Sequence, residues 1–184
     1  MIKQIWKPLV FVLVIGGLAT ALYVQVSSLK RPPVGIGIGE LAPDFTASTL
    51  EGETIRLSDF RGKTVLVNDF STRCGPCQAK TSSLEDVYNA EGDNVVFVGS
   101  NQQESGSKVT EFKDQYNIPY TLALVPDSKV TRLHRLVGLP TSWFIDSEGA
   151  VRYVHAGPMT AAMLEETLDA IREGREPNIN SALN

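Results

Sequence analysis

The chain has 184 residues, 42% of them hydrophobic, which is enough for one ordinary domain with a packed core. Four of its 17 basic residues, and none of its 21 acidic residues, lie in the first 31 positions, so the rest carries a net charge of −8. That balance argues against a nucleic-acid-binding domain, which normally shows a basic patch. The chain is also not a multi-disulfide scaffold, because its two cysteines both lie in one Cys-x-x-Cys.

The first predicted element is a transmembrane signal-anchor helix over residues 8–26, after a short tail of residues 1–7. This stretch is nearly free of polar side chains and is about as long as the hydrocarbon core of a bilayer requires. Residues 19–21 resemble a small-residue cleavage site, but the apolar run continues past them. We therefore predict an uncleaved anchor, with a cleaved signal peptide as the alternative. Two basic residues flank each end, so only the terminal amine favours a cytoplasmic N-terminus.

Residues 27–39 are predicted to be a linker. They combine Arg31-Pro32-Pro33 with glycines at alternate positions and have no hydrophobic periodicity. A phosphate-binding loop is the alternative, but no strand precedes these glycines and their spacing is not that of a dinucleotide fingerprint. We expect a tether that separates the membrane from a domain over residues 40–174, which a C-terminal tail of residues 175–184 follows.

Strands alternate with helices along the predicted domain. Short apolar runs predict strands over residues 54–57, 64–70, 95–98 and 121–125 and a hairpin of residues 142–146 and 151–155. Helical patterns predict a helix with Leu84, Val87 and Tyr88 on one face, a helix capped by Ser107, and a final helix from about Thr160 to Gly174. This order implies an α/β fold in which helices flank a mixed β-sheet.

Cys74-Gly75-Pro76-Cys77 lies where a buried strand gives way to a helix, a context typical of a redox motif. Cys74 falls at the helix N-terminus, where unpaired N–H groups and the helix dipole stabilise a thiolate. Cys77 lies one turn further on, within reach of a disulfide bond. Pro76 fits the first turn, which does not need its missing N–H. We expect Cys74 to attack and Cys77 to resolve.

Two other interpretations of the cysteine pair are weaker. Only His134 and His155 could complete a zinc site, and neither lies at finger spacing, so we predict no metal. A purely structural disulfide would restrict the unfolded chain little, because the loop it closes is so short. The redox-active disulfide is therefore expected to work without a further cofactor.

Several motifs together resemble the TlpA/ResA-like membrane-anchored thioredoxins of the AhpC/TSA superfamily, over roughly residues 40–173. They are residues 41–45 (LAPDF), 65–68 (VLVN), 74–77 (CGPC), 138–141 (GLPT), 144–146 (FID) and Gly149. The resemblance implies a thioredoxin fold held by its anchor on the outer side of the cell membrane. It implies that the protein reduces disulfides of protein substrates, often in cytochrome c maturation, and draws electrons from a membrane donor. Pro140 would be a cis-proline facing the disulfide, and Leu139 would offer its backbone to an extended substrate peptide.

Two of the departures from this family add positive charge near the cysteines. Arg73 stands where the family usually has a tryptophan before the first cysteine, and Lys80 stands where ResA-like members carry a glutamate. A nearby cation favours the thiolate, which lowers the thiol pKa and makes the disulfide more oxidising. We hypothesise that Arg73 and Lys80 act in this way. The alternative is that both side chains point to solvent and are screened.

Asp69 follows Asn68 in the predicted strand and therefore faces the opposite side of the sheet. We expect it to make a structural contact, with Arg73 as the candidate partner; proton acceptance from Cys77 is the alternative. Trp143 and the two histidines carry no spacing signal, so ordinary packing or surface roles are expected for them.

The predicted function is thiol–disulfide exchange on protein substrates through a mixed disulfide. A peroxiredoxin-like thiol peroxidase is an alternative, because residues 42–45 also resemble peroxiredoxins. Peroxiredoxins usually carry threonine three residues before the peroxidatic cysteine, however, and Ser71 stands there. A redox module dedicated to the maturation of one enzyme, or a binding module that has lost catalysis, also remains open.

Overall fold

The computed structural model describes residues 13–18, 20, 33–125 and 138–180. Residues 13–18 are helical, while most of the anchor predicted over residues 8–26 lies outside the described residues. No helix within the described ranges is long and apolar enough to cross a membrane. Residues 1–33 form one unit and the chain from Val34 onward forms another.

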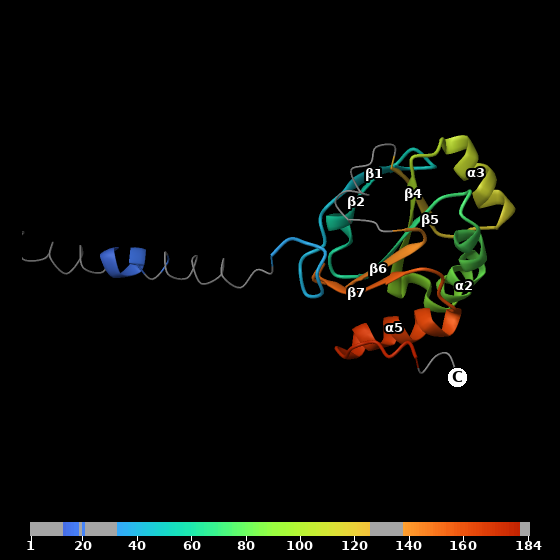
Figure 1. Cartoon of the computed structure of the whole chain (residues 1–184). Coiled ribbons are helices and arrows are strands. Elements are labelled where there is room, and N and C mark those ends of the chain that lie inside the picture. The colour runs from blue at the N-terminus through green and yellow to red at the C-terminus, as the bar shows by residue number, and fades with distance from the viewer. Residues whose placement is uncertain (1–12, 19, 21–32, 126–137, 181–184) are drawn as a thin grey trace, which may run out of the picture. The chain divides into compact units, whose positions relative to one another are not determined.

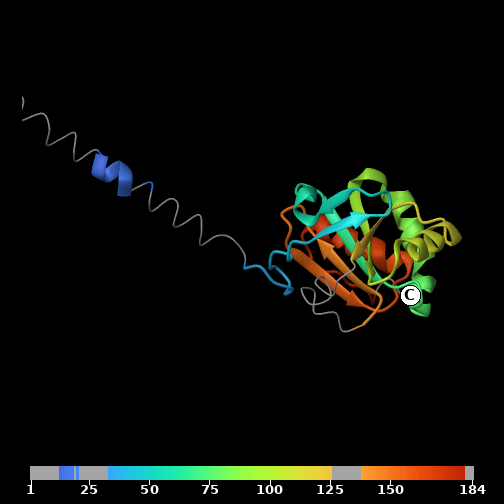
Figure 2. The same cartoon turned by 90° about the horizontal axis from the view of Figure 1, so that it is seen from above.

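The second unit is built on a seven-stranded mixed sheet with the strand order β2-β1-β5-β4-β3-β6-β7 (Figure 1). The central strands β3, β4 and β5 are parallel, whereas β1, β2, β6 and β7 pair in antiparallel fashion. The strands are β1 Thr46–Thr49, β2 Thr54–Arg56, β3 Thr64–Phe70, β4 Val95–Gln102, β5 Thr121–Val125, β6 Thr141–Ile145 and β7 Val151–Ala156. The predicted α/β fold with a mixed sheet is confirmed, including the β6–β7 hairpin (orange in Figure 2).

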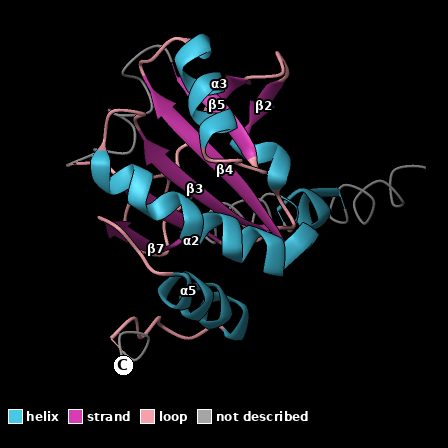
Figure 3. Ribbon diagram, turned by 90° about the vertical axis from the view of Figure 1, so that its right-hand side faces the viewer, coloured by secondary structure: helices cyan, strands magenta, loops and turns pink. Residues whose placement is uncertain are grey.

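Three helices lie over one face of this sheet (Figure 3). They are α2 Gly75–Glu91, α3 Gly106–Gln115 and α5 Ala161–Glu173, and short 3-10 turns, η2 Leu57–Phe60 and η3 Gly92–Asn94, accompany them. Helix α3 begins earlier than expected: Ser105 occupies the N-cap position, and the Ser107 hydroxyl contacts the Ser105 hydroxyl at 3.1 Å instead of capping. The predicted limits of α5 are confirmed by the Thr160 cap and by Gly174, whose φ of 69° ends the helix.

The alternation of β3 separates two hydrophobic clusters. Leu66 and Phe70 point into the cluster beneath the helices, whereas Val65 and Val67 belong to the cluster on the other face. All four are nearly inaccessible to solvent. Burial on both faces rigidly fixes the strand that ends at the cysteine loop.

The segment before β1 lies along the edge of the sheet. Gly39 N–H donates to the Val151 carbonyl at 2.7 Å, and Val151 N–H donates to the Glu40 carbonyl at 2.8 Å. Residues 34–39, which the sequence predicts as the end of a linker, therefore lie with the domain.

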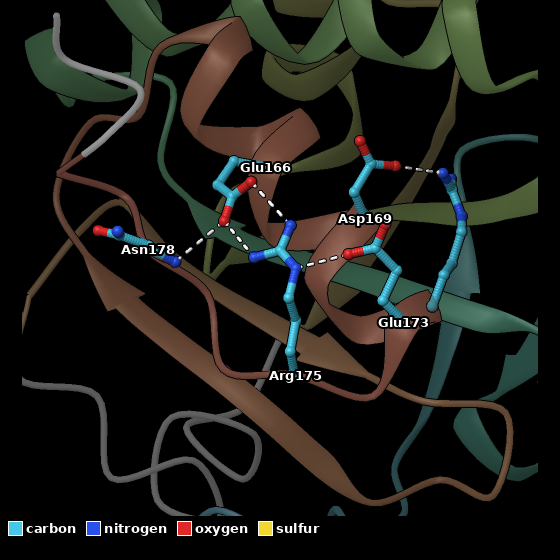
Figure 4. A network of polar contacts seen from close by, with 6 residues as sticks. Glu166, Asp169, Glu173, Arg175 and Asn178 are labelled. Carbon is cyan, nitrogen blue, oxygen red and sulfur yellow. Dashed lines mark hydrogen bonds and ion pairs between the residues drawn. The ribbon is translucent and has the colours of Figure 1, made fainter.

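Residues just after α5, predicted as a tail, fold back onto that helix (Figure 4). The guanidinium of Arg175 binds the Glu166 carboxylate at 2.5 Å, and Asn178 N–H donates to the same carboxylate at 3.1 Å. The hydrogen bonds from Arg175 and Asn178 lower the pKa of Glu166 to about 2. A second ion pair, Arg172 with Glu91, joins α5 to the end of α2.

Candidate active site

The two cysteines lie at the junction of β3 and α2 and form a disulfide bond with a Cα–Cα distance of 5.1 Å. Cys74 is the N-cap residue of α2, with an extended backbone. Its sulfur accepts a hydrogen bond from the backbone N–H of Cys77 at 3.2 Å, and Pro76 lies in the first turn. In the reduced protein, this N–H and the helix dipole would both stabilise a thiolate on Cys74.

The two sulfur-bearing residues differ in exposure. Cys74 is half-buried, whereas Cys77 is only 3% exposed and packs within the cluster beneath the helices. Gly75 and Pro76 between them are exposed. A partner disulfide can therefore approach Cys74 more readily than Cys77.

The Leu139–Pro140 peptide bond is cis, as the resemblance implies. Pro140 is buried, Leu139 is half-buried, and Gly138 is exposed. Pro140 immediately precedes β6, whose first residue, Thr141, pairs with Asp69 near the end of β3. This register brings the proline to the end of the sheet from which the cysteine loop departs.

Glu104 anchors the loop in front of Cys74, a role that the sequence analysis missed. Its side chain is only 3% exposed, and its oxygens accept hydrogen bonds from Thr72 N–H and Thr72 Oγ1, each at 2.7 Å. Asn101 donates to it at 2.8 Å, and the Nε of Arg73 lies 3.5 Å from it. Burial alone would raise the pKa of Glu104, but the hydrogen bonds from Asn101 and Thr72 outweigh burial and lower it.

The strand order of the sheet could have predicted that Glu104 lies beside the loop that carries Cys74. It follows β4, and β4 runs parallel to β3 in the next position of the sheet. Because parallel strands end at the same edge, the loop after β4 must lie beside the loop that carries Cys74.

Lys80 is buried, at 1% exposure, so the alternative that its side chain points to solvent is wrong. Its Nζ donates to Ser142 Oγ at 2.5 Å, and Ser142 Oγ donates to Asn68 Oδ1 at 3.1 Å. No carboxylate among the described residues forms an ion pair with Lys80. Burial therefore lowers the pKa of Lys80 to about 7.

Asp69 makes a structural contact on the face opposite Asn68, as predicted, but its partner is not Arg73. The indole Nε1 of Trp143 donates to Asp69 at 2.8 Å, and Gln102 donates to it at 3.0 Å. Arg73 pairs with Glu104 instead. Trp143, expected only to pack, thus also holds a buried carboxylate.

His155 faces the same region from β7, where it pairs in register with Ser142. Burial and, to a smaller extent, the charge of Lys80 lower the pKa of His155. A contact with the Pro158 carbonyl at 3.2 Å acts in the opposite direction. His134 lies outside the described residues. Within the described part of the chain, no group of three or more His, Cys, Asp or Glu residues could hold a metal ion.

Comparison with known proteins places this site in a family. The AhpC/TSA family profile matches residues 38–154. Thioredoxin-like protein YneN of Bacillus subtilis is 30% identical over 172 residues, which cover 92% of this chain and 99% of YneN. Thiol-disulfide oxidoreductase ResA of Geobacillus thermodenitrificans is 27% identical over 173 residues, 92% of this chain and 97% of ResA.

Solved structures also show similarity to thiol-disulfide oxidoreductases. The crystal structure of a proposed thiol:disulfide interchange protein DsbE from Chlorobium tepidum superposes with a TM-score of 0.67 at 26% identity, and the match covers 82% of this chain and all of that one. The fold, the cysteine pair and the relatives agree. The chain therefore belongs to the AhpC/TSA family and, within it, to the ResA-like thiol-disulfide oxidoreductases of thioredoxin fold.

Proposed function

We propose that this protein exchanges disulfides with protein substrates, with Cys74 as the attacking thiol and Cys77 as the resolving thiol. The observation that carries the proposal is the asymmetry of the pair: Cys74 is half-buried at the N-terminus of α2, whereas Cys77 is buried one turn behind it. The thiolate is the nucleophile in such exchange, so the better-stabilised and more accessible sulfur attacks first.

The exchange takes two steps. The Cys74 thiolate attacks a sulfur of the substrate disulfide, forms a mixed disulfide and releases one substrate thiolate. The Cys77 sulfur then attacks Cys74, closes the observed Cys74–Cys77 disulfide and releases the second substrate thiolate. Two electrons pass from the protein dithiol to the substrate, and each departing thiolate takes up a proton. The reverse sequence oxidises a substrate dithiol.

The loop before β6 is the proposed substrate-binding element. Leu139 is half-buried and packs, like Cys74, against the cluster beneath the helices. A backbone at this position can pair with an extended peptide whatever its side chains, which suits an enzyme with several substrates. Leu139 and Pro140 are the residues we assign to this contact.

We also propose that residues 8–26 anchor the protein in the cell membrane, with the domain on the extracytoplasmic side. The apolar run of that segment supports the anchor, and the resemblance to ResA-like proteins supports the extracytoplasmic side. A membrane electron donor would then keep the cysteine pair reduced. Cytochrome c maturation, a related thiol pathway or the maturation of one dedicated enzyme would supply the substrates.

Trapping tests the proposed roles of the cysteines. In cells, Cys77→Ser should accumulate mixed disulfides between Cys74 and substrate proteins, because the resolving sulfur is missing. Cys74→Ser is the matched control and should trap none. Equal trapping by both variants, or by neither, would contradict the assignment. Rapid peroxide consumption by the wild type, driven by a thiol reductant, would favour the peroxidase alternative instead.

A further inference from the structure

Lys80 is the charged residue most deeply buried beneath α2, and the two-step exchange described above leaves it without a role. It is 1% exposed, in the same range as the apolar core residues Leu66 and Leu122. Burying a lysine this deeply costs free energy, because its charged form must be removed from water. A buried amine on the same helix as a buried, reactive thiol suggests proton transfer.

Helix geometry directs Lys80 toward the cysteines. Cys77 and Lys80 are three residues apart in α2, so their side chains lie on the same face, and both are buried. Long helical side chains lean toward the N-terminus of their helix, which here is the end that bears Cys74. The amine reaches Ser142, two residues after Pro140, and is fixed there by the 2.5 Å hydrogen bond.

Few other titratable groups face this amine. On β6 it donates to Ser142, which donates in turn to Asn68 of β3, and neither of these side chains titrates near neutral pH. From β7 it meets His155, whose pKa is lowered. The buried face of α5, which packs against α2, presents Met163, Leu164, Thr167 and Leu168. On the buried face of its own helix Cys77 is the acidic group, because Glu85, Asp86 and Glu91 are half-buried or exposed, and Asp69 lies on the other face of the sheet.

We propose, on the basis of the exchange reaction assigned above, that the neutral amine of Lys80 takes the proton of the Cys77 thiol during the resolving step. The transfer runs directly or through one water molecule. Within the described residues no carboxylate ion-pairs with Lys80, so no anion stabilises the charged form of the amine before the transfer.

The step is balanced in protons and electrons. Cys77–SH and Lys80–NH2 become Cys77–S⁻ and Lys80–NH3⁺, and the new thiolate attacks the Cys74 sulfur of the mixed disulfide. The Cys74–Cys77 bond forms, the bond between Cys74 and the substrate breaks, and the leaving thiolate carries away the electron pair. Lys80–NH3⁺ then gives its proton to solvent or to that thiolate. Because burial lowers the pKa of Lys80 to about 7, both forms of the amine are accessible at neutral pH.

The reaction of the reduced full-length protein with the aromatic disulfide DTNB separates the two steps. The first thionitrobenzoate released reports attack by Cys74, and the second reports resolution by Cys77. For Lys80→Met we expect the ratio of the second rate constant to the first to fall by about tenfold or more at pH 7. Lys63→Met, which removes an exposed lysine just before β3, is the matched control and should leave the ratio unchanged.

The pH profile gives a readout that a purely structural lysine would not move. In the wild type the second rate constant should rise with pH and level off just above pH 7, where Lys80 becomes neutral. In Lys80→Met the midpoint should move up to the pKa of the buried Cys77 thiol itself, above about 8.5. Nitrogen NMR of the Lys80 amine in the oxidised wild type, which needs no variant, should show a midpoint within about one pH unit of 7.

Each result decides one of the two proposals. An unchanged ratio and midpoint in Lys80→Met, or an amine that stays charged up to about pH 10, would overturn the role of Lys80 and leave thiol–disulfide exchange intact. Absence of the first phase in the wild type would overturn exchange at Cys74, and the role of Lys80 with it.

Discussion

The carboxylate of Glu104 accepts two hydrogen bonds from Thr72, one from the backbone N–H and one from the hydroxyl, each at 2.7 Å. Thr72 precedes Cys74 by two residues, so this contact joins the loop after β4 to the loop that carries Cys74. A nearly buried carboxylate with four polar contacts holds that loop more firmly than an exposed ion pair would.

Glu104→Gln is expected to lower the free energy of unfolding by about 2 kcal/mol, because the amide places a donor where the carboxylate only accepts. Glu51→Gln is the matched control: Glu51 also pairs with a basic side chain, that of Lys113, but its own side chain is 51% exposed. Glu51→Gln should lower the free energy of unfolding by less than about 0.5 kcal/mol. Denaturant unfolding of the oxidised proteins measures both, and equal losses would contradict the anchoring role of Glu104.

The same carboxylate should make stability depend on pH. The pKa of Glu104 is lowered in the folded protein, so its contribution is complete above the unfolded value of 4.5 and is lost as pH falls through the folded pKa. Unfolding free energies measured between about pH 5 and pH 3 should therefore fall less steeply for Glu104→Gln than for the wild type. Identical slopes would show that Glu104 does not titrate in this range.

Arg73 remains predicted to favour the thiolate of Cys74, and the structure indicates a small effect. Its side chain is 79% exposed and its charge is paired with Glu104. Arg73→Ala should therefore lower the reduction potential by about 10 mV, roughly a twofold change in the equilibrium with glutathione. Lys63→Ala, an exposed cation at the opposite end of β3, serves as the control. A potential that is unchanged or higher in Arg73→Ala would refute the hypothesis.

Trp143 and Asp69 should be energetically coupled. Trp143→Phe removes the hydrogen bond from the indole N–H to a fully buried carboxylate, which should cost about 1–3 kcal/mol. Combining it with Asp69→Leu removes the acceptor as well, so the double variant should lose less stability than the sum of the single variants. A double-mutant cycle in denaturant should give a coupling of about 1 kcal/mol, and strict additivity would contradict the pairing.

Gly99 is required where β4 approaches β5. A Cβ at this position would lie 2.4 Å from Leu122 Cδ2 and 3.2 Å from Phe70 Cε1, both inside the cluster beneath the helices. Gly99→Ala should destabilise the protein by about 1–3 kcal/mol. Gly106→Ala, at the start of α3, meets only the end of Leu124 at 3.3 Å and should be near neutral. Thermal unfolding of the two variants side by side checks this difference.

The sequence predicts the architecture well where a periodic pattern meets a strong boundary residue. The run of residues 64–70 becomes β3, and Thr160 and Gly174 bound α5 as expected. It fails at β1, because Thr46–Thr49 carries only small and polar side chains and becomes a strand through pairing with β2 and β5.

The site is predictable to the extent that it is local in sequence. Cys74 as the cap of α2 and the cis peptide before Pro140 follow from motifs. The partners of Lys80 and Asp69 do not, because Ser142 and Trp143 come from β6, more than sixty residues away from them. Hydrogen bonds across strands depend on register, which the chain sets only when the whole sheet forms.

The short stretch ahead of β1 covers the start of the outer strand β7. β7 is an outer strand, and an unpaired outer strand invites another chain to add to it. Residues 39 and 40 form hydrogen bonds with the backbone carbonyl and N–H of Val151, the first residue of β7. A fragment that starts at Val34 keeps this cover, whereas one trimmed to residue 42 would leave the Val151 backbone groups unpaired at that end of β7 and should associate more readily with another chain.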